Sequence, residues 1–216
     1  MGQVSQYATI VADPPWHYEP FPVGAGQAKA RAARTGADYV SSRTKEMPYA
    51  TMSVEEIAAI PVASLAAPDA HLYLWTTNRY LADGFTVLRA WGFRYSQTLA
   101  WCKAPMGLGP GATYANTLEF ILVGKRGSLA PLRRWDTAWF NWKRMGNAHS
   151  RKPDAMLDIV EQVSPGPYVE LFARRARFGW DYWGDQSLGT AEMTAADEKP
   201  WTDLEERLDN LLAEPS

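Results

Sequence analysis

The chain has 216 residues, of which 46% are hydrophobic and 21% charged, so it is long enough for one folded domain with a sizeable core. It contains no run of about 18 apolar residues and no recognisable secretion signal, which predicts a cytoplasmic protein without a membrane span. The net charge of −2 conceals an acidic tail: residues 187–216 carry eight acidic and two basic side chains, so the remainder is mildly basic.

Disulfide and metal chemistry are disfavoured by the composition. The single cysteine, Cys102, excludes an internal disulfide and a cysteine-rich zinc site. The histidines at positions 17, 71 and 149 are too scattered to suggest a metal cage, so we predict no metal site.

Apolar runs of strand length alternate along the chain with segments of helical periodicity. In chain order the predicted elements are a strand over 8–12, a helix over 54–60, a strand over 71–76, a helix over 79–91, strands over 93–101 and 118–123, a helix over 153–163, strands over 168–172 and 180–183, and a C-terminal helix from about residue 203. Two polar stretches, residues 24–49 and 124–151, are predicted to be long loops. Residues 1–186 are predicted to form one domain and residues 187–216 an acidic tail that carries the last helix.

Local signals mark several helix boundaries. Ser53 and Glu56 form a capping box at the start of the first helix, and Pro61 follows its end. Gly92 supplies a C-cap for the second helix, and Pro153 opens the third.

Buried strands that alternate with helices predict an α/β fold, in which a mainly parallel sheet is covered by helices on both faces. Ligands bind such sheets beyond the carboxyl ends of the strands. This rule places four segments on one rim of the predicted sheet: residues 13–16, 75–79, 101–103 and 172–174.

The sharpest chemical signal is the sequence Asp13-Pro14-Pro15-Trp16, directly after the first predicted strand. The exocyclic amino group of adenine is a poor nucleophile because its lone pair is delocalised into the ring. The Asp13 carboxylate and the Pro14 carbonyl can accept both amino hydrogens, and two prolines hold that carbonyl in place. Trp16 can stack on the base. No side chain here can donate a methyl group, so methylation at this site needs a cofactor.

Six further segments accompany the ADPPW motif: residues 49–62, 71–81, 101–103, 117–124, 149–156 and 164–174. In sequence and in order these blocks resemble the N6-adenine methyltransferases of the MT-A type, typified by the catalytic subunit of the eukaryotic mRNA adenosine methylase, with many bacterial and phage relatives. The resemblance covers nearly all of residues 7–186. It implies a Rossmann-like S-adenosylmethionine-dependent methyltransferase fold with a circularly permuted motif order, because the catalytic motif precedes the cofactor motif.

The resemblance also implies roles for individual residues. The four residues of the DPPW motif would form the catalytic corner, and S-adenosylmethionine would be the cofactor. Cofactor contacts are implied for Asp13, Lys152, Glu170, Leu171, Arg174, Asp185 and Gln186. Lys152 would pair with the cofactor's carboxylate, and Glu170 and Arg174 would hold its ribose region. The chain departs from its larger relatives at Arg177, where they carry an amide.

Basic and aromatic side chains in both predicted loops favour nucleic acid as the substrate, because cations bind phosphates and aromatic faces bind unstacked bases. The predicted substrate contacts are Arg34 in the first loop, Arg133 and Arg134 in the second, and Trp16 in the motif; the resemblance adds Lys103 and Glu119. The alternative is that both loops are merely solvated and their tryptophans pack into the core.

DNA adenine is the first prediction for the substrate, because the chain is compact and lacks the RNA-binding extensions of eukaryotic relatives. RNA adenine is the alternative, and N4 of cytosine is the third choice, since its amino chemistry is the same. A non-catalytic nucleic-acid-binding subunit is a further alternative, against which the presence of Asp13 and Lys152 argues. Either a monomer or a homodimer is compatible with the sequence.

Overall fold

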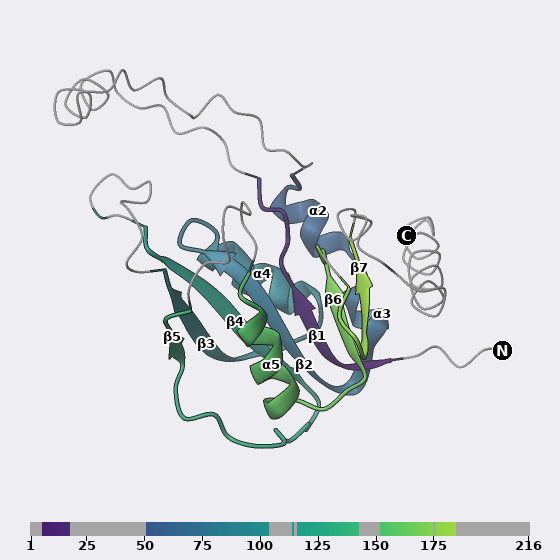
Figure 1. The fold of residues 1–216 in the computed structure, drawn as a ribbon. Helices are drawn as coiled ribbons and strands as arrows, with labels where there is room; N and C mark the ends of the chain where they lie inside the picture. The colour runs from purple at the N-terminus through teal and green to yellow at the C-terminus, as the bar shows by residue number, and fades with distance from the viewer. Residues whose placement is uncertain are drawn as a thin grey trace, which may run out of the picture.

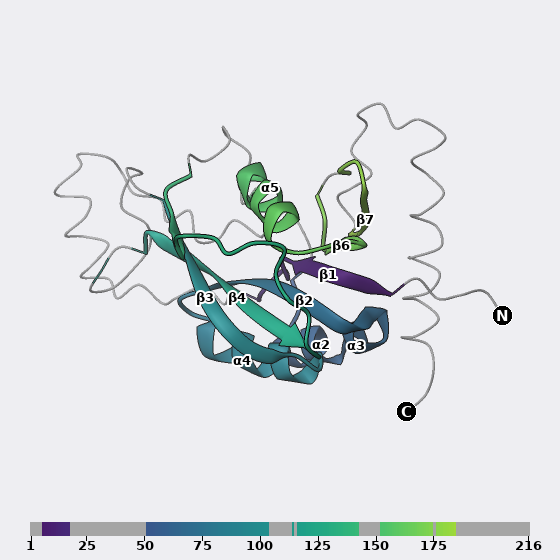
Figure 2. The same ribbon diagram turned by 90° about the horizontal axis from the view of Figure 1, so that it is seen from below.

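The computed structural model describes residues 6–17, 51–103, 114, 116–142, 152–174 and 176–184. Within them the chain forms one seven-stranded sheet with helices on both faces (Figures 1 and 2). The strands are β1 (Tyr7–Ala12), β2 (Ala66–Thr77), β3 (Arg94–Cys102), β4 (Leu118–Arg126), β5 (Trp139–Phe140), β6 (Tyr168–Leu171) and β7 (Trp180–Trp183). The helices are α2 (Val54–Ala59), α3 (Val62–Leu65), α4 (Leu81–Ala90) and α5 (Asp154–Val163). The loop predicted over 24–49 and the acidic tail 187–216 with its helix lie outside the described residues.

The strand order is β5-β3-β4-β2-β1-β6-β7. β1 pairs in parallel with β2 and β6, and the pairs β6–β7 and β3–β5 are also parallel. β4 is antiparallel to both of its neighbours, β2 and β3, so it alone among the seven described strands runs in the reverse direction. The prediction of a mainly parallel α/β sheet is therefore confirmed. The edge where the other six strands end and β4 begins is called the rim below.

The helices change face at β1. α2 and α3 connect β1 to its neighbour β2, and with α4 they lie on one face of the sheet, whereas α5 lies on the other face and leads into β6 (Figure 2). In open α/β sheets, ligands bind at the rim where the crossover connections diverge in this way. The fold thus points to the carboxyl end of β1, where the DPPW motif follows.

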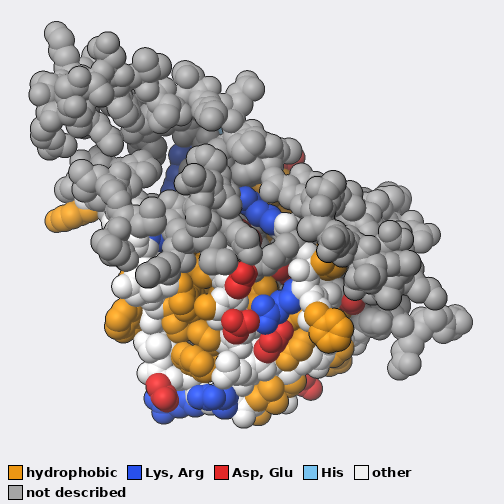
Figure 3. Space-filling view, viewed as in Figure 1, with side chains coloured by type: hydrophobic (Ala, Val, Ile, Leu, Met, Phe, Trp, Pro, Cys, Tyr) orange, Lys and Arg blue, Asp and Glu red, His pale blue; other side chains and the backbone are white. Residues whose placement is uncertain are grey.

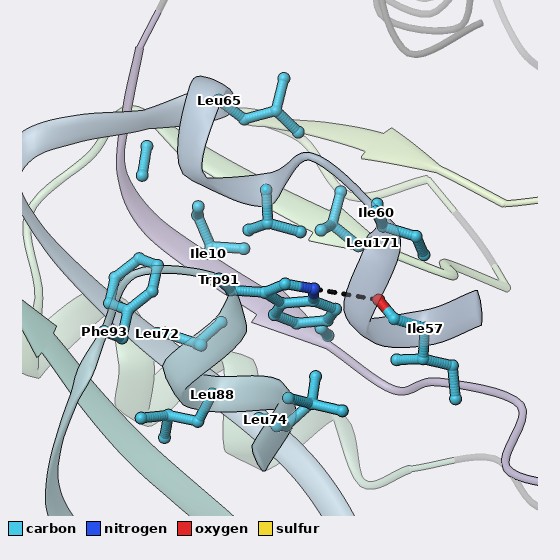
Figure 4. Packing of buried hydrophobic residues seen from close by; sticks show 14 of the residues in the cluster. Ile10, Ile57, Ile60, Leu65, Leu72, Leu74, Leu88, Trp91, Phe93 and Leu171 are labelled. Atoms are coloured by element: carbon cyan, nitrogen blue, oxygen red, sulfur yellow. Dashed lines mark hydrogen bonds between the residues drawn. The ribbon is translucent and has the colours of Figure 1, made fainter. Parts of the chain in front are cut away.

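The core on the α2–α4 face surrounds Trp91, which follows α4 and is fully buried. Its indole N–H donates to the Ile57 carbonyl at 3.0 Å, and leucines of β2 and α4 enclose the ring (Figure 4). A buried tryptophan removes about 150–250 Å² from water, and truncating such a side chain costs roughly 3–5 kcal/mol. This core fixes the segment before α2 that later contacts the DPPW motif.

A second core lies under α5. The helix presents Met156, Leu157 and Val160 to the sheet, which is the i, i+1, i+4 spacing of one helical face. The strand residues in this cluster are Val11, Tyr73, Trp75, Trp101, Ile121 and Trp180. Because α5 begins directly after Pro153, this packing also fixes the position of residue 152.

Several predicted boundaries are confirmed at residue level. The Ser53 side chain accepts from the Glu56 N–H at 3.1 Å, and the Glu56 carboxylate accepts from the Ser53 N–H at 2.7 Å, which completes the capping box. Gly92 has φ +81°, the left-handed conformation expected of a helix C-cap. No described helix has the length and apolarity needed to cross a bilayer.

The prediction of a loop over 124–151 was wrong for part of its described residues, 124–142; residues 143–151 lie outside the described part. β4 continues to Arg126, and β5 forms at 139–140. Residues 124–126 lack the apolar run of a buried strand, yet their backbones pair with residues 70–72 of β2, which itself starts five residues earlier than predicted. Gly124 suits this place because a Cβ there would lie 2.9 Å from Cβ of Phe93.

Candidate active site

Strand alternation brings four ionisable side chains to the rim on the face covered by α5. Side chains two residues apart on a strand point to the same face of a sheet. Counting two residues toward the rim from members of the core under α5 gives Asp13 from Val11, Lys103 from Trp101, Glu119 from Ile121 and Glu170 from Tyr168. Asp13, Glu170 and Lys103 come from the ends of the mutually parallel strands β1, β6 and β3, and Glu119 comes from the start of β4. The pairing register of the strands therefore brings the four side chains together.

Lys152, immediately before α5, stands at the centre of this group. Its Nζ lies 2.9 Å from Oδ1 of Asp13 and 3.3 Å from Oε2 of Glu119, and it lies 5.2 Å from the ring centroid of Trp75. Glu119 also forms an ion pair with Lys103. The result is a line of alternating charges along the rim, from Asp13 at β1 to Lys103 at β3, with each side chain largely buried.

The pKa values of the group follow from burial and these partners. Burial alone would lower the pKa of Lys152, but Asp13 and Glu119 outweigh it and hold that pKa above its usual range. Burial would raise the pKa of Glu119, yet Lys152 and Lys103 keep it below its ordinary value. Glu170 behaves in the opposite way: burial and then the charge of Asp13 raise its pKa to about 7, against a lowering effect of Arg177.

The DPPW corner is rigid in the backbone. The Pro14 carbonyl accepts from the Trp16 N–H at 2.9 Å, which is the i→i+2 bond of a γ-turn centred on Pro15. The Pro15 carbonyl accepts from the Met52 N–H at 2.9 Å, and the Asp13 N–H donates to the Leu171 carbonyl at 3.4 Å. A carbonyl has two lone pairs, so the Pro14 oxygen can accept a second hydrogen bond in the direction that this turn fixes.

The prediction that Trp16 stacks on a substrate base was wrong. Its side chain is 4% exposed, its ring stacks on Tyr80 at 5.2 Å, and its indole N–H donates to the Trp75 carbonyl at 3.1 Å. Trp16 therefore anchors the corner to β2 and to the residue before α4. A large aromatic ring after two prolines can fill the core as readily as it can face a ligand, and the sequence does not distinguish the two.

The segment that follows β6 turns sharply at the rim. Phe172 has φ +62°, a left-handed conformation that is uncommon for a large side chain. The Ala173 N–H donates to the Trp183 carbonyl at 2.9 Å, and a Cβ on Gly184 would lie 2.5 Å from the Ala173 oxygen. Gly184 is therefore required where β7 meets this turn, directly before Asp185 and Gln186, which lie outside the described residues.

The other residues predicted for the cofactor are placed as follows. Glu170 lies on the α5 side of the rim, near Asp13. Leu171 is fully buried in the core on the opposite face, so its side chain packs in the interior and its carbonyl supports Asp13. Arg174 lies two residues beyond the turn at Phe172 and is partly buried. Lys152 and Glu170 thus flank Asp13 from α5 and from β6.

Arg133 and Arg134, which are predicted to contact the substrate, do not lie beside the DPPW corner, and their contact with the substrate stays a prediction. The Leu132 N–H donates to the carbonyl of Val163 at the end of α5, and Arg133 donates to Gln162 at 3.3 Å. Lys152 stands at the other end of that helix, and ten residues of helix span about 15 Å. The segment between β4 and β5, which carries both arginines in its sequence, leaves β4 at the edge opposite the rim (Figure 1). Arg34, predicted in the same role, lies outside the described residues.

Three features of the site were missed from the sequence. The Trp75 ring, at the rim end of a predicted strand, packs in the core under α5, but its contact with the Lys152 ammonium was not predicted. The contact between Glu119 and Lys152 joins residues that were assigned to the substrate and the cofactor separately. Arg177 pairs with Asp158 and Glu161 of α5, whose i, i+3 spacing marks one acidic helix face.

Comparison with known proteins agrees with this geometry. A family model described as MT-A70 matches residues 7–186. The chain is 31% identical over 186 residues to the type II methyltransferase M.MunI of a Mycoplasma species, covering 83% of this chain and 77% of that protein. It is 28% identical over 193 residues to the N6-methyladenosine RNA methyltransferase MTA1 of Cryphonectria parasitica, covering 83% and 51%.

A more distant match is the N(6)-adenosine-methyltransferase catalytic subunit METTL3 of Homo sapiens, at 25% identity over 179 residues, covering 79% of this chain and 26% of that protein. The chain therefore spans most of the Mycoplasma protein but only a quarter to a half of these two eukaryotic ones. The family match runs from the first residue of β1 past the last residue of β7, over the DPPW corner and the whole charged rim. This chain belongs to the MT-A70 family.

Proposed function

We propose that the chain transfers a methyl group from S-adenosylmethionine to the N6 amino group of adenine in nucleic acid, with DNA as the substrate. Family membership supports the reaction. The observation that carries the residue assignment is the convergence of a carboxylate, a fixed carbonyl and a buried lysine at the rim. Asp13 and the Pro14 carbonyl belong to one turn, and Oδ1 of Asp13 lies 2.9 Å from Nζ of Lys152.

The donor set fits the cofactor. When bound, S-adenosylmethionine supplies an electrophilic methyl group on a sulfonium sulfur. Its amino acid moiety is a zwitterion, which needs a cation and an anion, and Lys152 and Asp13 offer both as a preformed pair. Glu170 is suited to a ribose diol, because within the described part of the chain its carboxylate has no side-chain partner and burial raises its pKa to about 7. Hydroxyl donors would satisfy that carboxylate.

The corner acts on the adenine amino group. The Asp13 carboxylate and the Pro14 carbonyl each accept one amino hydrogen, which turns the N6 lone pair out of conjugation with the ring. A bound sulfonium cofactor would supply the methyl group to which that lone pair bonds, and the electrons of its C–S bond would leave with sulfur. The methylated nitrogen is cationic and sheds one proton readily, so the site needs no strong base. What the protein supplies is orientation, which can lower a barrier by several kcal/mol.

DNA is proposed over RNA on two grounds. Of the three relatives described above, the type II methyltransferase of Mycoplasma is the one that this chain matches over most of its length. The RNA methyltransferase of Cryphonectria extends well beyond the matched region. An adenine in a duplex must be flipped out to reach a rim of this kind, and the unstacking energy would come from contacts outside the corner.

The test is methyl transfer to matched oligonucleotides. Wild-type protein is incubated with labelled S-adenosylmethionine and with DNA and RNA of the same sequence, and the nucleosides are then separated. We expect label in N6-methyldeoxyadenosine from DNA and little in RNA. Label in RNA alone would overturn the choice of DNA, and label in cytosine would overturn the adenine assignment.

Trp139 is the described residue best suited to contact the nucleic acid beyond the target base. Among the tryptophans of the described part it is the only exposed one, at 63%, whereas Phe140 is buried and stacks on Trp142 at 4.2 Å. Both backbone groups of Trp139 are occupied by the Thr137 hydroxyl, so the edge of β5 is closed to strand addition and the indole face remains. We propose that an unpaired base stacks on it.

Trp139→Ala should weaken binding of single-stranded oligonucleotides by about 1–3 kcal/mol, the usual contribution of one stacked base, and leave cofactor binding unchanged. Fluorescence anisotropy of a labelled oligonucleotide measures the first effect and calorimetry the second. Phe178→Ala is the control, because Phe178 is 99% exposed beside the opposite edge strand, β7. Equal effects of the two substitutions would remove the role of Trp139.

A further inference from the structure

Away from the DPPW corner, Arg177 makes three hydrogen bonds to two acidic side chains of α5. Its Nε donates to Oε1 of Glu161 at 2.9 Å, and its Nη2 donates to Oε2 of Glu161 at 2.9 Å and to Oδ1 of Asp158 at 2.7 Å. The two-pronged contact with Glu161 is the geometry in which an arginine is most specific. These acidic and basic side chains gather over α5 in Figure 3.

The Glu161 carboxylate, which accepts from Arg177, also accepts a hydrogen bond from a second residue. Oε1 of Glu161 also accepts from the Trp180 indole N–H at 2.7 Å, and the Trp180 ring stacks on Tyr168 at 4.7 Å. Trp180 begins β7 and Tyr168 begins β6, which are paired with each other. The arginine is therefore one part of a lock that joins α5 to β6 and β7.

The locked segment runs between the proposed ligand contacts. The chain leaves the end of β6 through the left-handed turn at Phe172, and Arg177 lies at the side of α5. The first end is held by the bond from Ala173 to Trp183, and the second end is held by Arg177. Arg174 stands between these two anchors, Glu170 precedes the first, and Lys152 precedes the N-cap of α5.

The charge of Arg177 also reaches the rim. It lowers the pKa of Glu170, against the raising effects of burial and of Asp13. Loss of that positive charge would therefore favour the protonated form of Glu170, which accepts hydrogen bonds from hydroxyl groups less well than a carboxylate does.

We propose that Arg177 is a positioning residue for the cofactor: it ties the start of β7 to α5 and so sets the separation between Lys152 and Glu170, which would hold the two ends of S-adenosylmethionine. The inference rests on the proposed function. It assigns Arg177 no direct contact with the ribose, because Asp158 and Glu161 take up its guanidinium on the helix side. The arginine therefore acts through the spacing and ionisation of other residues.

The experiment compares Arg177→Gln, Arg177→Lys and Arg133→Gln by calorimetric titration of S-adenosylmethionine across a pH series. Arg177→Gln should bind the cofactor roughly 10-fold more weakly, a change of about 1.4 kcal/mol. Its affinity should also fall at a higher pH than in the wild type as the solution is acidified, because Glu170 would protonate sooner. Arg177→Lys should keep the wild-type pH midpoint, since it keeps the charge, and lose part of the affinity, since it loses the two-pronged contact.

Arg133→Gln is the matched control, because Arg133 also contacts α5, through Gln162, but at the end away from the rim. It should change neither the affinity nor the midpoint. If Arg177→Gln lowers the melting temperature but binds the cofactor with wild-type affinity and midpoint, Arg177 is merely structural and the inference fails. If the wild-type protein does not bind S-adenosylmethionine at all, the proposed function fails instead, so the two failures are distinguishable.

Discussion

The two ends of the sheet solve the problem of buried polar groups in opposite ways. At the end of the sheet opposite the rim, called the base here, Tyr73 and His71 both contact the Ser164 hydroxyl, at 2.8 Å and 2.7 Å. The other His71 ring nitrogen contacts the Leu129 carbonyl at 3.1 Å. Every side chain in this chain of hydrogen bonds is neutral and satisfied, and burial lowers the pKa of His71, which keeps it uncharged.

The rim instead keeps charges out of water. Lys152 is shared by two carboxylates, and Glu170 lies close enough to Asp13 for the latter's charge to raise its pKa. Buried ion pairs are weak sources of stability, because desolvation offsets much of the attraction. The base is therefore neutral and satisfied, whereas the rim holds charges at a cost in stability, as the proposed function requires of a ligand site.

The largest expected effect comes from removing the cation that the rim shares. Lys152→Ala should lower the free energy of unfolding by about 3–5 kcal/mol, because buried carboxylates lose their partner. It should also weaken S-adenosylmethionine binding by roughly 1.5–3 kcal/mol. Urea denaturation and calorimetry measure these changes, with Arg89→Ala, an exposed cation on α4, as the control. Unchanged affinity would mean that the cofactor's carboxylate is held elsewhere.

Glu170→Gln sharpens the comparison of rim and base, because the contribution of Glu170 to stability depends on pH. The folded-state pKa of Glu170 is about 7 and the ordinary value is 4.5, so its contribution to stability is complete below pH 4.5 and is lost as the pH rises through 7. Glutamine does not titrate, so the variant should become more stable than the wild type above pH 7, by about 3 kcal/mol, while it loses cofactor affinity. Equal stability of the two proteins at pH 8, on the basic side of that pKa, would contradict the account.

Ser164→Ala tests the base of the sheet and should have the smallest effect. Two buried groups lose a partner, which should cost about 1–3 kcal/mol of unfolding free energy. The pKa of His71 is lowered from 6.5, so in the wild type its contribution is present above pH 6.5 and is lost as the pH falls, the reverse of Glu170. Cofactor binding should not change. A loss of cofactor affinity would show that the two ends are coupled.

Local sequence signals predicted the parts of the fold that local interactions decide. The capping box at Ser53, the left-handed Gly92 and the apolar face of α5 are each set within one helical turn. The extension of β4 to Arg126 and the edge strand at Trp139 depend instead on which strands become neighbours, and that information is spread over the whole chain.

The site shows the same division. The corner at Asp13 and the lysine before α5 were predicted, because each stands in a distinctive motif. The burial of Trp16 and the remote position of Arg133 were not, because they depend on packing against Tyr80 and Gln162, residues far away in the sequence. Charge and aromatic composition indicated nucleic acid binding but not which side chains remain exposed to do it.

The central claim is that Asp13 orients the amino group of adenine for methyl transfer, and the most direct test is single-turnover transfer by Asp13→Ala. Saturating S-adenosylmethionine and a DNA oligonucleotide are used, and thermal unfolding and calorimetric titration show whether the variant is folded and loaded. The account predicts a rate at least about 100-fold below that of the wild type, the usual effect of removing one preorganised hydrogen-bonding group from a transition state. A folded, loaded variant that transfers methyl groups at the wild-type rate would contradict it.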